Sequence, residues 1–257
     1  MDLGIKGKLA LVTAASSGMG RNIAHMLAAE GANVVLFSRT EEKLRVVCQE
    51  IESQHGVKAT AVVGNMTRHE DVVQLAQTLK ELGGPDILVL VSARPPNPLR
   101  ETLKEDEQAR WDEAYRAQLW SIIDLVTLTV PLMLDKGWGR IVSVTSASAK
   151  QPMAVHALST VFRAGVTAYM KGLAGEVAPH GVTVNCVAPA LIDTSHRQGA
   201  SAYSKEQATH RKTLTPMGRL GTQEELCGVI TFLASRQAGF VTGSTIAVEG
   251  GMISSLF

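Results

Sequence analysis

Two glycines near the start of the chain have the type and spacing to bind a phosphorylated ligand. Gly18 and Gly20 follow the apolar run Leu9–Thr13 and precede residues 22–30, whose apolar positions recur on one helical face. Backbone N–H groups at a helix start, aided by the helix dipole, bind pyrophosphate, and glycine permits close approach. Strand, glycine-rich turn and helix in this order predict a dinucleotide-binding site. A tight turn without a ligand is the alternative, since Ala14 stands where a first glycine is often found.

The end of the next apolar run indicates which dinucleotide would bind. An acidic residue about 20 positions past the glycines would hold the ribose 2′-hydroxyl of NAD. Ser38 stands there instead and is followed by Arg39. A carboxylate would repel a 2′-phosphate, whereas a guanidinium binds one with paired hydrogen bonds. The sequence therefore favours NADP(H) over NAD(H); the alternative is that Arg39 only begins a solvated turn before Glu41.

The elements that must position these residues alternate along the chain. Continuous apolar runs predict strands at residues 9–13, 32–38, 59–64, 86–91, 140–145, 182–187 and 244–248. Amphipathic stretches predict helices at residues 22–30, 41–53, 70–82, 103–108, 111–134, 160–177, 204–212 and 223–235. This alternation predicts an α/β fold, with a parallel sheet wound on both faces. Ligands of such sheets bind beyond the carboxyl ends of the strands, so the turns there should line one crevice.

The composition of the chain argues against several classes of function. The 257 residues are 45% hydrophobic and carry a net charge of +1 spread along the chain, which argues against nucleic-acid binding. The three cysteines are scattered in apolar contexts, as expected of buried thiols in a reducing compartment. The histidines show no metal-ligand spacing, so no metal is expected. No signal peptide or apolar run of membrane-spanning length is recognised, so the expected location is cytoplasmic and no membrane contact is expected.

Six stretches of the chain form a recognisable set: TAASSGMG (13–20), DILV (86–89), GRIVSVTS (139–146), GVTVNCVAPALIDT (181–194), PMGRLGTQEEL (216–226) and VTGSTIAVEGG (241–251). Together they resemble the short-chain dehydrogenase/reductase family, in its 3-oxoacyl-(acyl carrier protein) reductase-like branch. The resemblance implies one Rossmann domain over residues 1–257, with a doubly wound seven-stranded parallel sheet and a substrate lid at about 190–216. It also implies a nicotinamide-dependent oxidoreductase, for which Arg39 favours NADP, a small-molecule substrate, and a homotetramer or homodimer.

The resemblance also implies which residues contact the cofactor. They lie on the turns after the strands, and Arg163 would hold the nicotinamide ribose. The full set is Thr13, Ser16, Ser17, Gly18, Met19, Gly20, Ser38, Arg39, Asn65, Met66, Arg163, Pro189, Ile192 and Thr194.

The chain departs from the family at the residues that do the chemistry. The family's serine is present as Ser146, and its active-site asparagine aligns with Gln118. Its Tyr-x-x-x-Lys pair should begin 13 residues after the serine, where the chain has Ser159 and Arg163. The family's Asn-Asn-Ala-Gly after DILV is replaced by residues 90–93, which read LVSA.

The replaced pair removes the family's proton donor. Hydride transfer to a ketone leaves an alkoxide, which tyrosine protonates while the lysine lowers its pKa. Ser159 is a poor proton donor, and Arg163 stays charged and relays no proton. Arg163 can still hold the nicotinamide ribose and supply a positive field. Ser146 can still donate a hydrogen bond to a substrate oxygen, so orientation and electrostatics survive.

Several routes around the missing acid remain open. His156 titrates near neutrality and could be the acid, or it could be a surface or capping residue. Tyr203 could swing in from the lid, or water could relay a proton through Ser146 and Ser159. An iminium substrate needs no proton, because hydride addition gives a neutral amine directly.

The hypothesis from sequence is an NADP(H)-dependent reductase of a carbonyl or imine in a small organic molecule, with a non-standard site. Its catalytic candidates are Ser146, Ser159, Arg163, Gln118 and His156. The alternatives are a lyase, dehydratase or cyclase on the same fold, and an inactive NADP-binding partner subunit. Halohydrin dehalogenases also carry the arginine, but they keep the tyrosine and rebuild the nucleotide loop to hold halide, so dehalogenation is disfavoured.

Overall fold

Seven parallel strands form one sheet at the centre of the molecule. The computed structural model describes residues 2–193 and 204–256. The strands lie in the order β3-β2-β1-β4-β5-β6-β7. Their bounds are β1 Leu9–Thr13, β2 Asn33–Ser38, β3 Ala59–Val63, β4 Ile87–Val91, β5 Gly139–Val144, β6 Val182–Pro189 and β7 Thr245–Val248. Each predicted strand is confirmed, and the predicted seven-stranded, doubly wound sheet is the observed fold.

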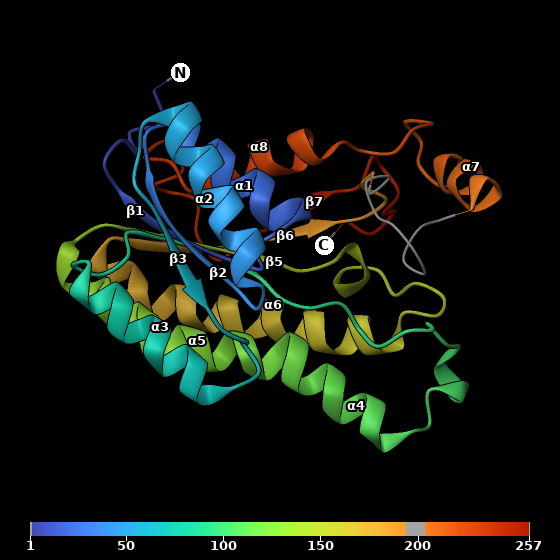
Figure 1. The fold of residues 1–257 in the computed structure, drawn as a ribbon. Helices are drawn as coiled ribbons and strands as arrows, with labels where there is room; N and C mark the ends of the chain where they lie inside the picture. The colour runs from blue at the N-terminus through green and yellow to red at the C-terminus, as the bar shows by residue number, and fades with distance from the viewer. Residues whose placement is uncertain (1, 194–203, 257) are drawn as a thin grey trace.

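Helices cover both faces of the sheet, as Figure 1 shows. One face carries α1 Gly18–Ala29, α2 Glu41–His55 and α8 Gln223–Leu233. The other carries α3 His69–Glu81, α4 Gln108–Ala114, α5 Ser121–Thr129 and α6 Ala157–Val177. The short helix α7, Lys205–Thr213, stands away from both layers. Parallel strands need such crossovers, and the crossover helices bury the sheet from both sides.

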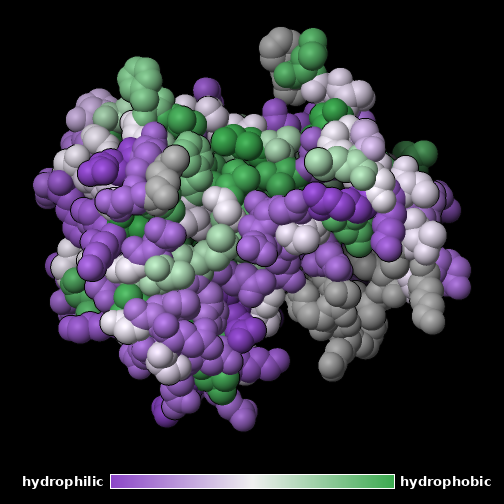
Figure 2. All heavy atoms as spheres, turned by 90° about the horizontal axis from the view of Figure 1, so that it is seen from above, coloured by the Kyte–Doolittle hydropathy of each residue, from purple (hydrophilic) through white to green (hydrophobic). Residues whose placement is uncertain are grey.

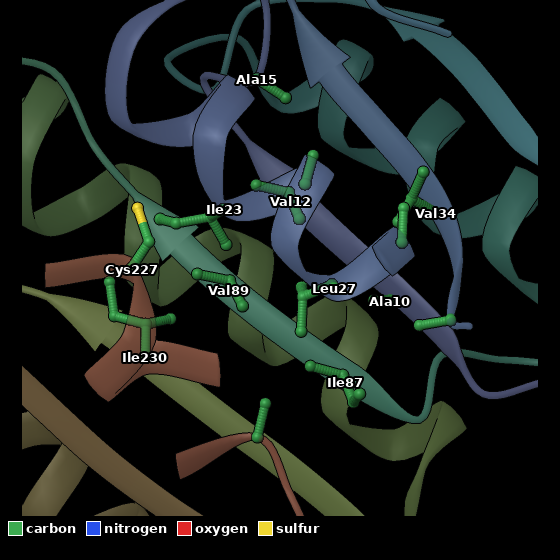
Figure 3. Packing of buried hydrophobic residues seen from close by; sticks show 14 of the residues in the cluster. Ala10, Val12, Ala15, Ile23, Leu27, Val34, Ile87, Val89, Cys227 and Ile230 are labelled. Atoms are coloured by element: carbon green, nitrogen blue, oxygen red, sulfur yellow. The ribbon is translucent and has the colours of Figure 1, made fainter. Parts of the chain in front are cut away.

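Alternate side chains of each strand enter two separate cores. Ala10 and Val12 of β1 belong to the core under α1 and α8, while Leu11 between them belongs to the opposite core. Figure 3 shows Ile23 and Leu27 of α1 in the first of these two cores, together with Ala10 and Val12. Strands buried on both faces must be apolar at every position, and this is why continuous apolar runs predicted them.

The helical stretch after β4 differs from the prediction. One helix was expected at residues 111–134, with a short helix before it at 103–108. Instead α4 leads into a π-helical segment at Tyr115–Trp120 and then α5, and only a 3₁₀ turn, Thr102–Lys104, precedes α4. Pro131 ends α5 in a 3₁₀ turn, because proline lacks the N–H that an α-helix needs. The extra residue of a π segment rotates the side chains that follow it to another face of the helix. The periodicity of the sequence does not predict such a segment.

Helices α1 and α6 begin earlier than predicted. Helix α1 starts at Gly18 rather than at residue 22, so the glycines of the turn lie in its first turn. Helix α6 starts at Ala157 rather than at residue 160. Both differences bring a helix N-terminus closer to the carboxyl edge of the sheet.

The stretch Gln108–Lys136 has the length and hydropathy of a membrane-spanning helix, with a mean hydropathy of 1.6 in its most apolar window. No run of that kind was expected from the sequence. Half of this window is buried inside the molecule, as expected of a core helix. Hydrophilic residues cover most of the face that carries α1, α2 and α8, and apolar residues are visible at several places, with one larger group above its centre (Figure 2).

The crevice for a ligand lies where the direction of winding changes. Strand β1 pairs with β2 on one side and with β4 on the other, so the loops after β1 and β4 diverge. Thr13 fixes their spacing: its hydroxyl donates to the carbonyl of Val91 at 2.9 Å and accepts from the N–H of Val91 at 2.7 Å. Thr13 is therefore a buried tie between the two strands.

Candidate active site

The turn between β1 and α1 is shaped to admit a phosphate. A Cβ on Gly20 would lie 2.4 Å from the carbonyl oxygen of Ala14, so only glycine fits there. Gly18 has φ +55°, which favours glycine, and Ala14 adopts φ +51° despite its side chain. Ser17 is the N-cap of α1 and makes no side-chain capping bond. The first N–H groups of α1 are therefore left for a ligand.

The predicted contacts to the 2′-position lie side by side. Ser38 at the end of β2 donates from its hydroxyl to the hydroxyl of Ser16 at 2.8 Å. Arg39 comes next and is exposed, and its guanidinium makes no observed hydrogen bond or ion pair within the described residues. A pair of hydroxyls and, one residue further along the chain, an exposed guanidinium without a partner among the described residues are groups that suit a phosphate monoester.

The remaining predicted cofactor residues are placed unequally. The side-chain oxygen of Asn65 accepts from the N–H and the hydroxyl of Thr67, so it stabilises its own turn. Met66 is partly buried and packs against the core under α3, α5 and α6. Ile192 is 8% exposed and pairs with Gly221, next to Pro189 at the end of β6. Thr194 lies outside the described residues, as does Tyr203.

Ser146 comes after β5, and its hydroxyl accepts two hydrogen bonds from one neighbour. The N–H of Ser148 donates at 3.2 Å and the hydroxyl of Ser148 donates at 2.9 Å. A serine oxygen has two lone pairs, so both are used, and the proton of Ser146 is left to donate outward. Ser148 is fully buried and was not among the predicted site residues.

Arg163 lies across the ends of β4 and β5. Its Nη1 donates to the hydroxyl of Ser92 at 2.6 Å and to the carbonyl of Val144 at 3.0 Å, and its Nη2 donates to the carbonyl of Ala93 at 2.9 Å. Burial lowers the pKa of the Arg163 guanidinium to about 10, so the group stays charged at neutral pH. A guanidinium has five N–H donors, so these three bonds leave two for a cofactor or substrate.

Ser159 lies one turn before Arg163 on α6. Its side chain is 7% exposed, and no hydrogen bond of its hydroxyl is observed within the described part of the chain. The two residues share a helix face because they are four positions apart.

The two remaining candidates, Gln118 and His156, differ in their surroundings. Gln118 lies in the π-helical segment, is fully buried, and has no hydrogen-bond partner for either amide atom among the described residues. A buried amide without partners is costly, so it marks a place for water or ligand. His156 is the N-cap residue of α6, and its Nδ1 lies 2.6 Å from the carbonyl of Ala154. The His156 side chain makes no capping hydrogen bond to α6, so its role as an acid or as a surface residue stays a prediction.

Sequence reasoning missed Ser92, Ser148 and Arg110 as residues that shape the site. Ser92 had been noticed only as a departure from the family's pattern, and its partner Arg163 lies 71 positions later. Arg110 is buried and binds the loop after β4. Nothing local in the sequence reports such contacts, because each joins residues far apart in the chain or in an irregular loop.

Comparison with known proteins places this geometry in context. A family described as enoyl-(acyl carrier protein) reductase matches residues 13–253. The 3-oxoacyl-[acyl-carrier-protein] reductase of Vibrio cholerae serotype O1 is 36% identical over 251 residues, covering 97% of this chain and 99% of the relative. The chain belongs to the short-chain dehydrogenase/reductase family. It is thus a member of an oxidoreductase family, in the branch that resembles 3-oxoacyl-(acyl carrier protein) reductases.

Solved structures agree with this membership. The L-sorbose reductase of Gluconobacter frateurii, complexed with NADPH and L-sorbose, superposes with a TM-score of 0.91 at 29% identity, and each chain is fully covered. A 3-oxoacyl (acyl-carrier-protein) reductase of Agrobacterium tumefaciens C58 with NADP bound superposes with a TM-score of 0.88 at 31% identity, over 97% of this chain and 95% of the other.

Proposed function

We propose that the protein is an NADP(H)-dependent reductase of a carbonyl or imine group in a small organic molecule, working with a non-standard set of catalytic residues. The observation that carries the cofactor is the turn after β1, where Gly20 lets the start of α1 pack directly against the backbone of Ala14 and Ser17 makes no side-chain capping bond to the first N–H groups of the helix. Arg39, exposed and next in the chain to the hydrogen-bonded pair Ser38 and Ser16, favours the phosphorylated dinucleotide. Relatives solved with NADP and NADPH support the same choice.

The residues present fit this cofactor. The N-terminus of α1, with Gly18 and Gly20, would hold the pyrophosphate, and Arg39 the 2′-phosphate. Arg163 would reach the nicotinamide ribose with the two N–H groups that the protein does not use. When bound, the nicotinamide supplies the hydride.

The chain's own residues then act on the substrate oxygen. The proton of Ser146 is free to donate to that oxygen, because Ser148 fills both lone pairs of the Ser146 hydroxyl. The charged Arg163 nearby favours negative charge on the oxygen. Ser159 takes the place of the family's tyrosine and Arg163 that of its lysine, so no tuned acid is present. The missing acid matters least for a substrate that needs no added proton, such as an iminium ion, because hydride addition gives a neutral amine directly.

The decisive experiment is a screen for hydride transfer. Purified protein is incubated with NADPH carrying deuterium at the transferred position, together with a panel of ketones and a panel of cyclic imines. We expect deuterium in a product, detected by mass spectrometry, with imines reduced faster than ketones. Binding of NADPH without transfer to any member of either panel would refute the reductase function and favour an inactive NADP-binding subunit. Failure to bind the nucleotide would favour a lyase, dehydratase or cyclase.

A further inference from the structure

The connection from β4 to α4 is long and irregular, and it begins at the site. It runs over residues 92–107 with one 3₁₀ turn as its regular structure. It begins at Ser92, which contacts Arg163, and it ends at the helical stretch that carries Gln118. Connections of this length inside a compact domain usually serve a function.

Arg110 binds the middle of this loop from behind. Its guanidinium forms a two-pronged ion pair with the carboxylate of Glu105. The same guanidinium donates to the backbone carbonyls of Pro98 at 2.7 Å, Asn97 at 3.3 Å and Pro96 at 3.4 Å. Arg110 is 8% exposed and Glu105 is 5% exposed, so the two charged side chains are buried, whereas Asn97 and Pro98 of the loop are exposed.

Stability alone is a weak reason for such an arrangement. Removing two charges from water costs free energy, and their attraction repays it only when the geometry is good and the other donors are satisfied. Here the spare donors are spent on three consecutive carbonyl groups of the loop, at Pro96, Asn97 and Pro98. The effect is to fix the path of the backbone at those residues.

Arg163 fixes the same loop at its root. It binds the hydroxyl of Ser92 and the carbonyl of Ala93. Only two residues, Arg94 and Pro95, separate Ala93, which Arg163 binds, from Pro96, which Arg110 binds. Proline fixes φ, so this bridge is stiff. The position of one guanidinium therefore constrains the other through residues 92–98.

We propose that Arg110 is a positioning residue that presets Arg163 for the cofactor through the loop of residues 92–98. With Arg110 in place the loop root is fixed, and Arg163 holds its two spare N–H groups in one orientation. Without Arg110 the loop root moves, and Arg163 must be reordered when the nucleotide binds. The effect on the cofactor rests on the proposed function, whereas the mechanical link between the two arginines does not.

The first test is limited proteolysis with trypsin of the full chain. Arg100 and Lys104 lie in the loop and are potential cleavage sites. We expect Arg110→Met to speed cleavage there about tenfold, and Arg110→Lys to have a smaller effect. The matched control is Arg116→Met, an exposed arginine on the same helical stretch, which should leave cleavage unchanged. A cooperative thermal transition is required of each variant, so that cleavage reports the loop and not global unfolding.

The second test is a double-mutant cycle with Arg110→Met and Arg163→Met, read by NADPH binding. We expect Arg110→Met to weaken NADPH binding about threefold to tenfold, and to have no further effect in the Arg163→Met background. An equal loss in both backgrounds, or no loss from Arg110→Met, would overturn the proposal.

If the unaltered protein does not bind NADPH, the proposed function fails. Trypsin cleavage of the unaltered protein, the two single variants Arg110→Met and Arg163→Met, and the double variant then decides whether the two arginines are linked through the loop. Arg163→Met must then also speed cleavage in the loop, and the logarithms of the two single-variant effects must not add. Additive effects would overturn the link.

Discussion

Restoring the family's acid–base pair would test the role given to Ser159 and Arg163. In the variant Ser159→Tyr/Arg163→Lys, a tyrosine hydroxyl and a lysine would occupy neighbouring turns of α6. The lysine has a single nitrogen, so it can replace Nη1 of Arg163 but leaves the carbonyl of Ala93 without its donor. Ala93 is exposed, so we expect a loss near the lower end of the range for an unsatisfied acceptor, about 1 kcal/mol in urea unfolding.

The variant should be more active than the unaltered protein despite this small loss of folding stability. A positioned general acid contributes roughly 10²–10⁴-fold to a rate. We expect kcat/KM for simple ketones to rise about 100-fold above that of the unaltered protein, which corresponds to about 2.7 kcal/mol of transition-state stabilisation. The assay is NADPH oxidation with a panel of ketones, and Ser159→Phe/Arg163→Lys is the control that supplies the ring without the hydroxyl. A folded, NADPH-binding tyrosine variant that is no faster than the phenylalanine control would refute the assignment of both positions.

Three further predictions concern the frame around the site, and a fourth concerns the cysteines. Gly20→Ala should lower the free energy of unfolding by about 1–3 kcal/mol and impair NADPH binding, because its Cβ meets backbone atoms; Gly172→Ala, with open space, is the control. Thr222→Ala removes the N-cap of α8 and should cost about 1 kcal/mol in urea unfolding. The hydrogen bond from Arg219 lowers the pKa of Glu225 to about 2 from its usual 4.5, so the destabilisation by Glu225→Gln should shrink as pH falls from 4.5 to 2. Burial raises the pKa of the cysteine thiols to about 11–12, so the native protein should resist alkylation at neutral pH until it unfolds, whereas rapid labelling would contradict the burial of Cys48, Cys186 and Cys227.

The sequence predicted the sheet well because its strands are buried on both faces. A continuous apolar run as short as Leu9–Thr13 is typical of a strand whose two faces are both covered by helices. The same logic placed Ser38 and the glycine turn at one edge, since all carboxyl ends of parallel strands meet there. The alternation of strands and helices was enough to predict that edge, whereas the binding of a cofactor there stays a prediction.

The details of the catalytic region could not be predicted in the same way. The π-helical segment at Tyr115–Trp120 leaves the composition of the helix unchanged, so periodicity pointed to one continuous helix. Arg163 was expected to face the cofactor, yet its bonds to Ser92 and Ala93 depend on the path of a loop about 70 residues earlier. Such contacts arise from tertiary structure and leave no local pattern.

The most direct test of the central claim is equilibrium titration with NADPH and, separately, with NADH, monitored by nicotinamide fluorescence. The account predicts that NADPH binds more tightly than NADH, and that Arg39→Ala weakens NADPH binding while leaving NADH binding unchanged. Equal affinity for the two nucleotides would contradict the role of Arg39. Binding of neither would contradict the claim that this site serves an NADP-dependent reductase.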